Sequence, residues 1–175
     1  MKRFVATLLL TTLALTALAQ GGIPLLDKVE GKRVQFHYTY SLSKDGKPMQ
    51  KVTDGDVTVE DNAFLLSGLG LEVRSDGTTR WSIDREAEEV LIEKVVKEDI
   101  FTNPALFISS YKSYMDHIKV NSYSQDSLDV TLVLDEDTSA RFVLKDIRFL
   151  DRKGKSDFTL DVKSLSSSYV ITDLR

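Results

Sequence analysis

The sequence predicts an α+β fold that is mainly antiparallel β, with eight or nine strands and one helix in a single domain. Most of the chain after residue 32 consists of short segments in which apolar and polar residues alternate, separated by turns rich in Asp and Gly. One segment, from Pro104 to about Met115, instead carries apolar residues at helical spacing. Hairpins joined in series form an antiparallel sheet, and a sheet this long tends to curl into a barrel or half-barrel. The helix would lie across its open face.

The first strand is predicted over residues 32–42, because its apolar and polar residues alternate strictly. Its apolar face consists of Val34, Phe36, Tyr38 and Tyr40. The pairs Asp45-Gly46 and Asp76-Gly77 suit tight hairpin turns. Further strands are expected at 51–60, at 63–74 with a bulge or tight bend at Gly68 and Gly70, at 79–83 and at 88–96.

A helix is predicted next, because Asn103 suits the N-cap and Pro104 the first helical position. Its apolar stripe consists of Leu106, Phe107, Tyr111 and Met115. Strands are expected to resume at 127–135, 139–150, 156–165 and 168–174.

The N-terminus has the features of a secretory signal peptide. Lys2 and Arg3 precede an apolar run that ends in Ala17-Leu18-Ala19, and the run is shorter than the roughly 20 residues of a bilayer span. We therefore expect residues 1–19 to be cleaved. Residues 20–175 would then form a single soluble periplasmic domain without a lipid anchor.

Composition excludes several functions. The chain has no cysteine, so disulfides, zinc-thiolate sites and thiol nucleophiles are excluded. Without the signal peptide's two basic residues, Lys and Arg fall from 23 to 21 against 27 Asp and Glu, a net charge of −6. Nucleic acid is an improbable partner, because a phosphate-binding surface needs clustered cations.

Catalytic motifs are also weak. The two histidines are His37, which shares its parity with polar strand residues, and His117, which follows the helix. The Ser-x-x-Lys tetrads at 41–44 and 109–112 lack the other elements of serine acylation chemistry. Acidic runs lack the spaced oxygen ligands of a calcium loop. We therefore expect no catalytic residues, no bound metal and no cofactor.

Three stretches, 44–50, 75–83 with Glu89-Val90 after it, and 103–107, resemble the LolA-like outer-membrane lipoprotein carriers. The Asp76-to-Trp81 part follows that family's Asp-Gly-x-x-x-Trp pattern, and the order and spacing match over roughly residues 35–115. The resemblance implies an unclosed, strongly twisted half-barrel of about eight to eleven strands with a helical lid.

The resemblance also implies a function and partners. It implies a periplasmic carrier, monomeric and not an enzyme, that binds the acyl chains of lipoproteins and shuttles them from the inner to the outer membrane. Its partners would be acylated lipoproteins, an inner-membrane lipoprotein-release transporter and an outer-membrane acceptor. The family's third strand begins with Arg-Pro, whose arginine fastens the lid, whereas this chain has Glu60-Asp61-Asn62-Ala63 there.

We predict one lipid-binding cavity and a lid from these patterns. The cavity would be lined by Phe36, Tyr38, Tyr40, Leu71, Val73, Trp81, Ile83, Val90 and Ile92. The lid would consist of Leu106, Phe107, Tyr111 and Met115. Trp81, the one tryptophan, would report a bound acyl chain by its emission. The same alternation also fits a closed core, because a buried face does not reveal a vacancy behind it.

Two other functions remain open. One is an exported domain that senses or scaffolds envelope components through a lipid-binding cleft without shuttling them. The other is an exported hydrolase that uses scattered carboxylates, which would require a buried carboxyl pair in a polar cleft.

Overall fold

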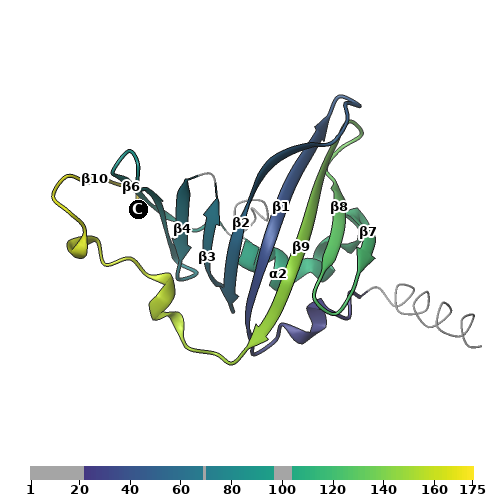
Figure 1. Cartoon of the computed structure of the whole chain (residues 1–175), viewed down its shortest axis with the longest axis horizontal. Helices are drawn as coiled ribbons and strands as arrows, with labels where there is room; N and C mark the ends of the chain where they lie inside the picture. The colour runs from purple at the N-terminus through teal and green to yellow at the C-terminus, as the bar shows by residue number, and fades with distance from the viewer. Residues whose placement is uncertain (1–21, 69, 97–103) are drawn as a thin grey trace, which may run out of the picture.

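A computed structural model describes residues 22–68, 70–96 and 104–175. Ten strands form one open sheet in the order β10-β6-β5-β4-β3-β2-β1-β9-β8-β7 (Figure 1). The neighbouring strands are antiparallel except β10 and β6, which run parallel. The prediction of a mainly antiparallel, unclosed sheet is therefore confirmed, and the described residues contain one short α-helix. The expected signal peptide and the N-cap at Asn103 lie outside the described residues.

The strands are β1 (Arg33–Lys44), β2 (Gln50–Glu60), β3 (Ala63–Gly68), β4 (Leu71–Ser75), β5 (Thr79–Asp84), β6 (Glu89–Lys94), β7 (Ile118–Tyr123), β8 (Leu128–Val133), β9 (Thr138–Leu150) and β10 (Val170–Asp173). The α-helix is α2 (Pro104–Ser110). The 3-10 helices are η1 (Leu26–Lys28), η2 (Tyr111–His117), η3 (Lys155–Phe158) and η4 (Val162–Ser164).

Three predicted elements were wrong in detail. Residues 63–74 form the hairpin β3–β4 and not one bent strand, because Gly70 adopts φ 76° and reverses the chain. The predicted helix changes to 3-10 geometry after Ser110. The segment 156–165 is not a strand, because it forms two 3-10 turns and is held by its side chains. Strand β7 was not predicted.

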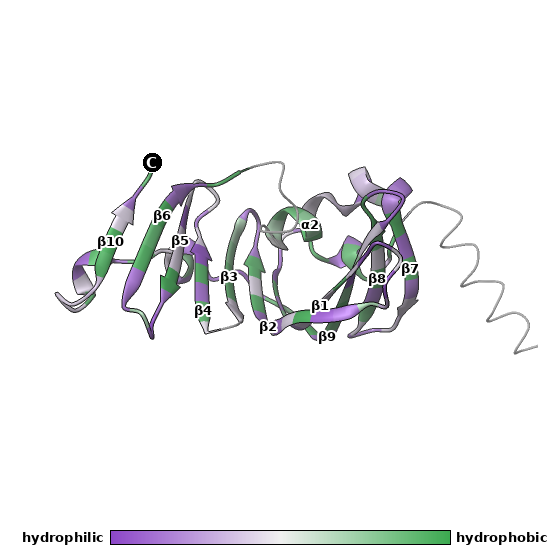
Figure 2. Cartoon of the chain, turned by 90° about the horizontal axis from the view of Figure 1, so that it is seen from above, coloured by the Kyte–Doolittle hydropathy of each residue, from purple (hydrophilic) through white to green (hydrophobic). Residues whose placement is uncertain are grey.

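The strand register assigns side chains to two faces of the sheet, since directly paired residues point the same way. Phe36 pairs with Val57, Val57 with Leu66, Leu66 with Val73, and Val73 with Ser82. These residues share the helix face, against which α2 lies (Figure 2). Residues of the opposite parity share the other face, which the segment 151–169 crosses. We call that segment the strap and that face the strap face.

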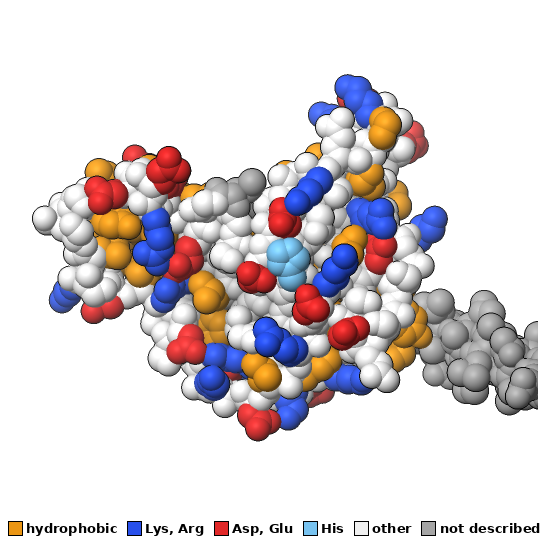
Figure 3. Space-filling view, viewed as in Figure 1, with side chains coloured by type: hydrophobic (Ala, Val, Ile, Leu, Met, Phe, Trp, Pro, Cys, Tyr) orange, Lys and Arg blue, Asp and Glu red, His pale blue; other side chains and the backbone are white. Residues whose placement is uncertain are grey.

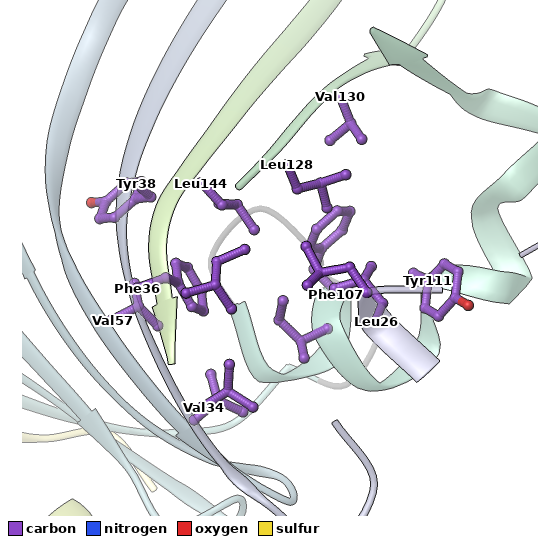
Figure 4. Close-up of a cluster of buried hydrophobic side chains, with 14 of the residues drawn as sticks. Leu26, Val34, Phe36, Tyr38, Val57, Phe107, Tyr111, Leu128, Val130 and Leu144 are labelled. Atoms are coloured by element: carbon purple, nitrogen blue, oxygen red, sulfur yellow. The ribbon is translucent and has the colours of Figure 1, made fainter. Parts of the chain in front are cut away.

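The helix face carries the larger apolar cluster, which we call the helix cluster (Figure 4). Phe107 from α2 and Leu26 from η1 face strand residues such as Phe36 and Leu128 in this cluster. Its buried members are Ile23, Leu25, Leu26, Val34, Phe36, Tyr38, Val57, Val59, Phe64, Ala105, Phe107, Ile108, Tyr111, Leu128, Val130, Leu132, Leu144 and Ile147.

A second cluster lies at the other end of the sheet, on the strap face. It consists of Trp81, Ile83, Val90 and Ile92, against which Leu160, Val162, Leu165 and Tyr169 of the strap pack. The rest of the strap face, over β1, β2 and β9, is charged (Figure 3). His37 is half-exposed there, where its Nδ1 lies 3.1 Å from Asp56 Oδ1.

A buried ion pair fixes the start of the strap. Arg33 and Glu60 are cross-strand partners, 4% and 0% exposed, and Arg33 Nε donates to Glu60 Oε2 at 2.8 Å. The N–H groups of Lys153 and Gly154 donate to the Glu60 carboxylate at 3.0 and 2.8 Å. Arg33 also donates to Asp157 Oδ2 at 2.7 Å. The pair therefore holds the start of the strap against the ends of β1 and β2 at which Arg33 and Glu60 lie.

We predict that Glu60→Gln lowers the free energy of unfolding by about 3 kcal/mol, because it removes the buried counter-ion of the Arg33 guanidinium and leaves only the half-exposed Asp157 carboxylate. Urea unfolding followed by Trp81 fluorescence measures the change. Lys32→Gln is the matched control, because Lys32 pairs at 3.1 Å with Asp151, which is 97% exposed. Such a surface pair contributes less than about 1 kcal/mol. Equal losses of unfolding free energy in the two variants would contradict the conclusion that the Arg33–Glu60 pair stabilises the fold more than a surface pair does.

The same pair predicts a pH dependence. Burial would raise the pKa of Glu60, but the N–H of Lys153, the Arg33 guanidinium and the N–H of Gly154 together hold this pKa below its ordinary value of 4.5. The stabilising contribution of Glu60 is therefore complete above pH 4.5 and is lost as the pH falls through the lowered folded-state pKa. The difference in unfolding free energy between the wild type and Glu60→Gln should shrink below pH 4.5.

Candidate functional site

The space between α2 and the helix face is the candidate site. Aromatic side chains meet there from three elements: the Phe107 and Phe142 rings stack at 5.8 Å, and the Tyr40 and Phe142 rings stack at 5.0 Å. Half-buried apolar residues surround the buried core and extend it toward solvent. They are Val29, Tyr40, Leu66, Val73, Leu106, Tyr114, Met115, Ile118, Val120, Tyr123, Phe142 and Phe149.

The predicted lid residues all lie in this region. Phe107 and Tyr111 are buried in the helix cluster, and Leu106 and Met115 are half-buried against it. α2 contacts β2 and β3. The helix therefore covers the part of the helix face that these residues reach, and the remaining part toward β10 lies outside its cover (Figure 2).

The structure does not bring the nine predicted cavity residues together. Phe36 and Tyr38 are buried in the helix cluster, and Tyr40 and Val73 are half-buried beside it. Leu71 is 39% exposed on the same face, outside the cluster.

The other four predicted cavity residues lie on the strap face, where they form the second cluster: Trp81, Ile83, Val90 and Ile92. The expectation of one shared cavity is therefore wrong, because Val73 pairs with Ser82 and so places Trp81 on the opposite face. The emission of Trp81 therefore depends on its contacts with the strap and not on the helix cluster. Whether either group binds lipid stays a prediction.

A polar anchor fastens α2 and η2 to the N-terminal segment. Tyr111 donates its hydroxyl hydrogen to Asp27 Oδ1 at 2.8 Å, and the N–H of Ile23 donates to the Tyr111 hydroxyl at 3.2 Å. Lys112 Nζ lies 2.7 Å from the same Asp27 oxygen. We call Asp27, Tyr111 and Lys112 the lid anchor. It joins residues more than 80 positions apart, and no sequence pattern indicates it.

The electrostatics of the lid anchor favour an ionised Asp27. Hydrogen bonds from Lys112 and then from Tyr111 lower the pKa of Asp27. Burial, and then the bond to Asp27, raises the pKa of Tyr111. The phenol therefore stays a donor at neutral pH. Glu60 lies away from the lid anchor, because it pairs with Arg33 on the strap face.

A pocket of about 430 Å³ lies beside the lid anchor. Residues of η1, the β2–β3 turn, α2 and η2 line it, with Leu26, Ile108 and Tyr111 among them. The full lining is Leu26, Asp27, Val29, Glu30, Gly31, Asp61, Asn62, Ile108, Ser109, Tyr111 and Lys112. Of the predicted site residues, only Tyr111 contributes to it. The pocket shows that solvent reaches the end of the helix where the anchor holds it.

Other site types find no support among the described residues. No group of three or more His, Asp or Glu side chains is placed to hold a metal ion within them. No helix in this part of the chain is long and apolar enough to cross a membrane. The buried carboxylate of Glu60 is fully engaged by Arg33 and two backbone N–H groups.

Comparisons with known proteins leave the family open. No protein-family model matches the chain, and no curated protein matches it. Among solved structures, the chain is similar to an uncharacterized conserved protein from Thermus thermophilus, with a TM-score of 0.46 and 7% sequence identity. The match covers 85% of this chain and 96% of that one.

We predict that Tyr111→Phe loosens the helix from the N-terminal segment, because it removes the hydroxyl that joins Asp27 to the N–H of Ile23. The expected loss is about 1 kcal/mol of local stability, measured as faster amide hydrogen exchange over 104–111. Tyr114→Phe is the control, because the Tyr114 hydroxyl has no hydrogen-bond partner among the described residues. Equal exchange in both variants would show that the anchor does not hold the helix.

Proposed function

We propose that this protein is a periplasmic carrier that holds the acyl chains of lipoproteins between α2 and the helix face and shuttles them from the inner to the outer membrane. The curled half of the sheet would act as the half-barrel, with α2 and η2 as its lid. One observation carries the proposal: a short helical cover lies on a broad apolar sheet face and is fastened by a small polar anchor at Tyr111. The sequence resemblance to lipoprotein carriers supports it.

The free-energy cost of carrying an acyl chain through water agrees with this arrangement. Exposing an acyl chain of about 15 methylenes to water costs on the order of 12 kcal/mol, at ~0.8 kcal/mol per methylene. A soluble carrier must therefore bury nearly the whole chain in apolar surroundings. Displacing α2 would open the helix cluster, whose buried and half-buried side chains supply such surroundings. No bond needs to be made or broken.

The test is release of a labelled lipoprotein from inner-membrane preparations by the purified mature protein. A carrier removes the lipoprotein into the soluble fraction in stoichiometric amounts. A sensor or scaffold would instead form a stable complex at the membrane without release, and that outcome would contradict shuttling.

We predict where the acyl chain lies. A photo-crosslinking amino acid in place of Phe142, which is half-buried beside Phe107 and Tyr40, should crosslink to the acyl chain. The same amino acid at the next residue, Val143, is the matched control, because Val143 pairs with Thr39 and faces the strap side. We expect a several-fold higher yield from position 142, detected by mass spectrometry. Equal yields, or a higher yield at 143, would exclude the helix face as the site.

A further inference from the structure

The helix face has a free end with a pocket of its own. β4, β5, β6 and β10 extend away from α2 (Figure 2). A pocket of about 340 Å³ lies there, within the roughly 300–1,000 Å³ typical of ligand sites. Its lining consists of Leu71, Ser82, Asp84, Glu89, Val90, Leu91, Val170 and Thr172.

The pocket exposes apolar side chains. Leu71 is 39% exposed and Val170 is 60% exposed, and Leu91 between them is half-buried. The register places all three on the helix face, since Leu71 pairs with Asp84 and Val170 with Glu89. Covering exposed apolar side chains in a pocket with another molecule lowers the free energy, because it removes apolar surface from water.

The same pocket carries uncompensated negative charge. Asp84 and Glu89 are cross-strand partners on β5 and β6, and neither forms an ion pair with another described residue. The next charged pair on this face, Arg80 and Glu93, is neutralised by a contact of 2.7 Å. Directly paired like charges are destabilising, and a cation between them relieves the repulsion. An anionic bilayer surface would be repelled.

Arg and Lys side chains match both properties. Their methylene stems pack along apolar surface while the charged head reaches polar partners at the rim. At this pocket, the stems would cover Leu71, Leu91 and Val170, and the heads would reach Asp84 and Glu89. All four residues of the neighbouring edge strand β10 are exposed, so a polypeptide can approach the pocket from that side.

We propose that this pocket binds a short basic segment of a partner protein. The site is separate from the acyl-chain site, which occupies the covered part of the helix face. The protein would therefore have a polypeptide-binding site in addition to the proposed acyl-chain site.

Fluorescence anisotropy with a labelled peptide of alternating Arg and Gly tests the proposal on the full mature chain. Asp84→Asn with Glu89→Gln removes both charges, and Asn keeps the oxygen that accepts from the N–H groups of Glu86 and Ala87. The control pair, Glu86→Gln with Asp137→Asn, removes the same net charge from turns outside the pocket. We expect about fivefold weaker binding in the pocket variant and unchanged binding in the control.

Three outcomes would overturn the proposal. The first is equal binding to both double variants. The second is equal binding of a Glu-Gly peptide of the same length. The third is binding of phosphatidylglycerol vesicles in place of the peptide. Because crosslinking from position 142 probes the other site, it separates failure of this proposal from failure of the carrier function.

Discussion

The buried pair of Arg33 and Glu60 fixes where the strap begins its course from β9 to the far end of the sheet. A buried ion pair is a poor source of net stability, because desolvation offsets most of the attraction between the charges. In this protein the pair acts mainly by fixing the position of the chain that follows β9. Two backbone N–H groups, the carbonyl of Gly154 and the Asp157 carboxylate also bind to the pair, so these hydrogen bonds fix the path of the chain leaving β9. That path sends the strap across the strap face, where the second cluster would otherwise be open to water.

The two covers of the sheet are held in different ways. The strap is fixed at both ends, by the Arg33–Glu60 pair at its start and by β10 at its end, where the N–H of Val170 donates to Glu88 O at 2.8 Å. The helical cover is held by its apolar side chains and by the lid anchor. Moving the strap requires breaking a strand ladder and the hydrogen bonds that join residues 153, 154 and 157 to the buried Arg33–Glu60 pair, whereas moving the helix requires neither. The helix is therefore the cover that the proposed carrier function would open.

Sequence patterns identified most strands and many buried residues, but not the face on which each residue lies. Phe36 and Trp81 both alternate with polar neighbours and are both buried, yet they lie on opposite sides of the sheet. Their relation depends on how many residues each intervening turn uses, and the turn between β4 and β5 pairs Val73 with Ser82, which places Trp81 on the face opposite Val73. A single changed turn reverses the parity of every later strand. Long-range anchors such as Asp27 with Lys112 leave no local pattern at all.

The lid anchor sets the energy scale of the proposed opening. The Asp27–Lys112 pair is exposed, so solvent screens it and it contributes little. The buried Tyr111 hydroxyl contributes about 1 kcal/mol as a typical net hydrogen bond. An acyl chain gains on the order of 12 kcal/mol from burial. In the proposed carrier, the anchor would therefore keep the empty protein closed without opposing an acyl chain appreciably. The apolar contacts of Phe107 and Tyr111 with the sheet, which an acyl chain would replace, would determine most of the cost of opening.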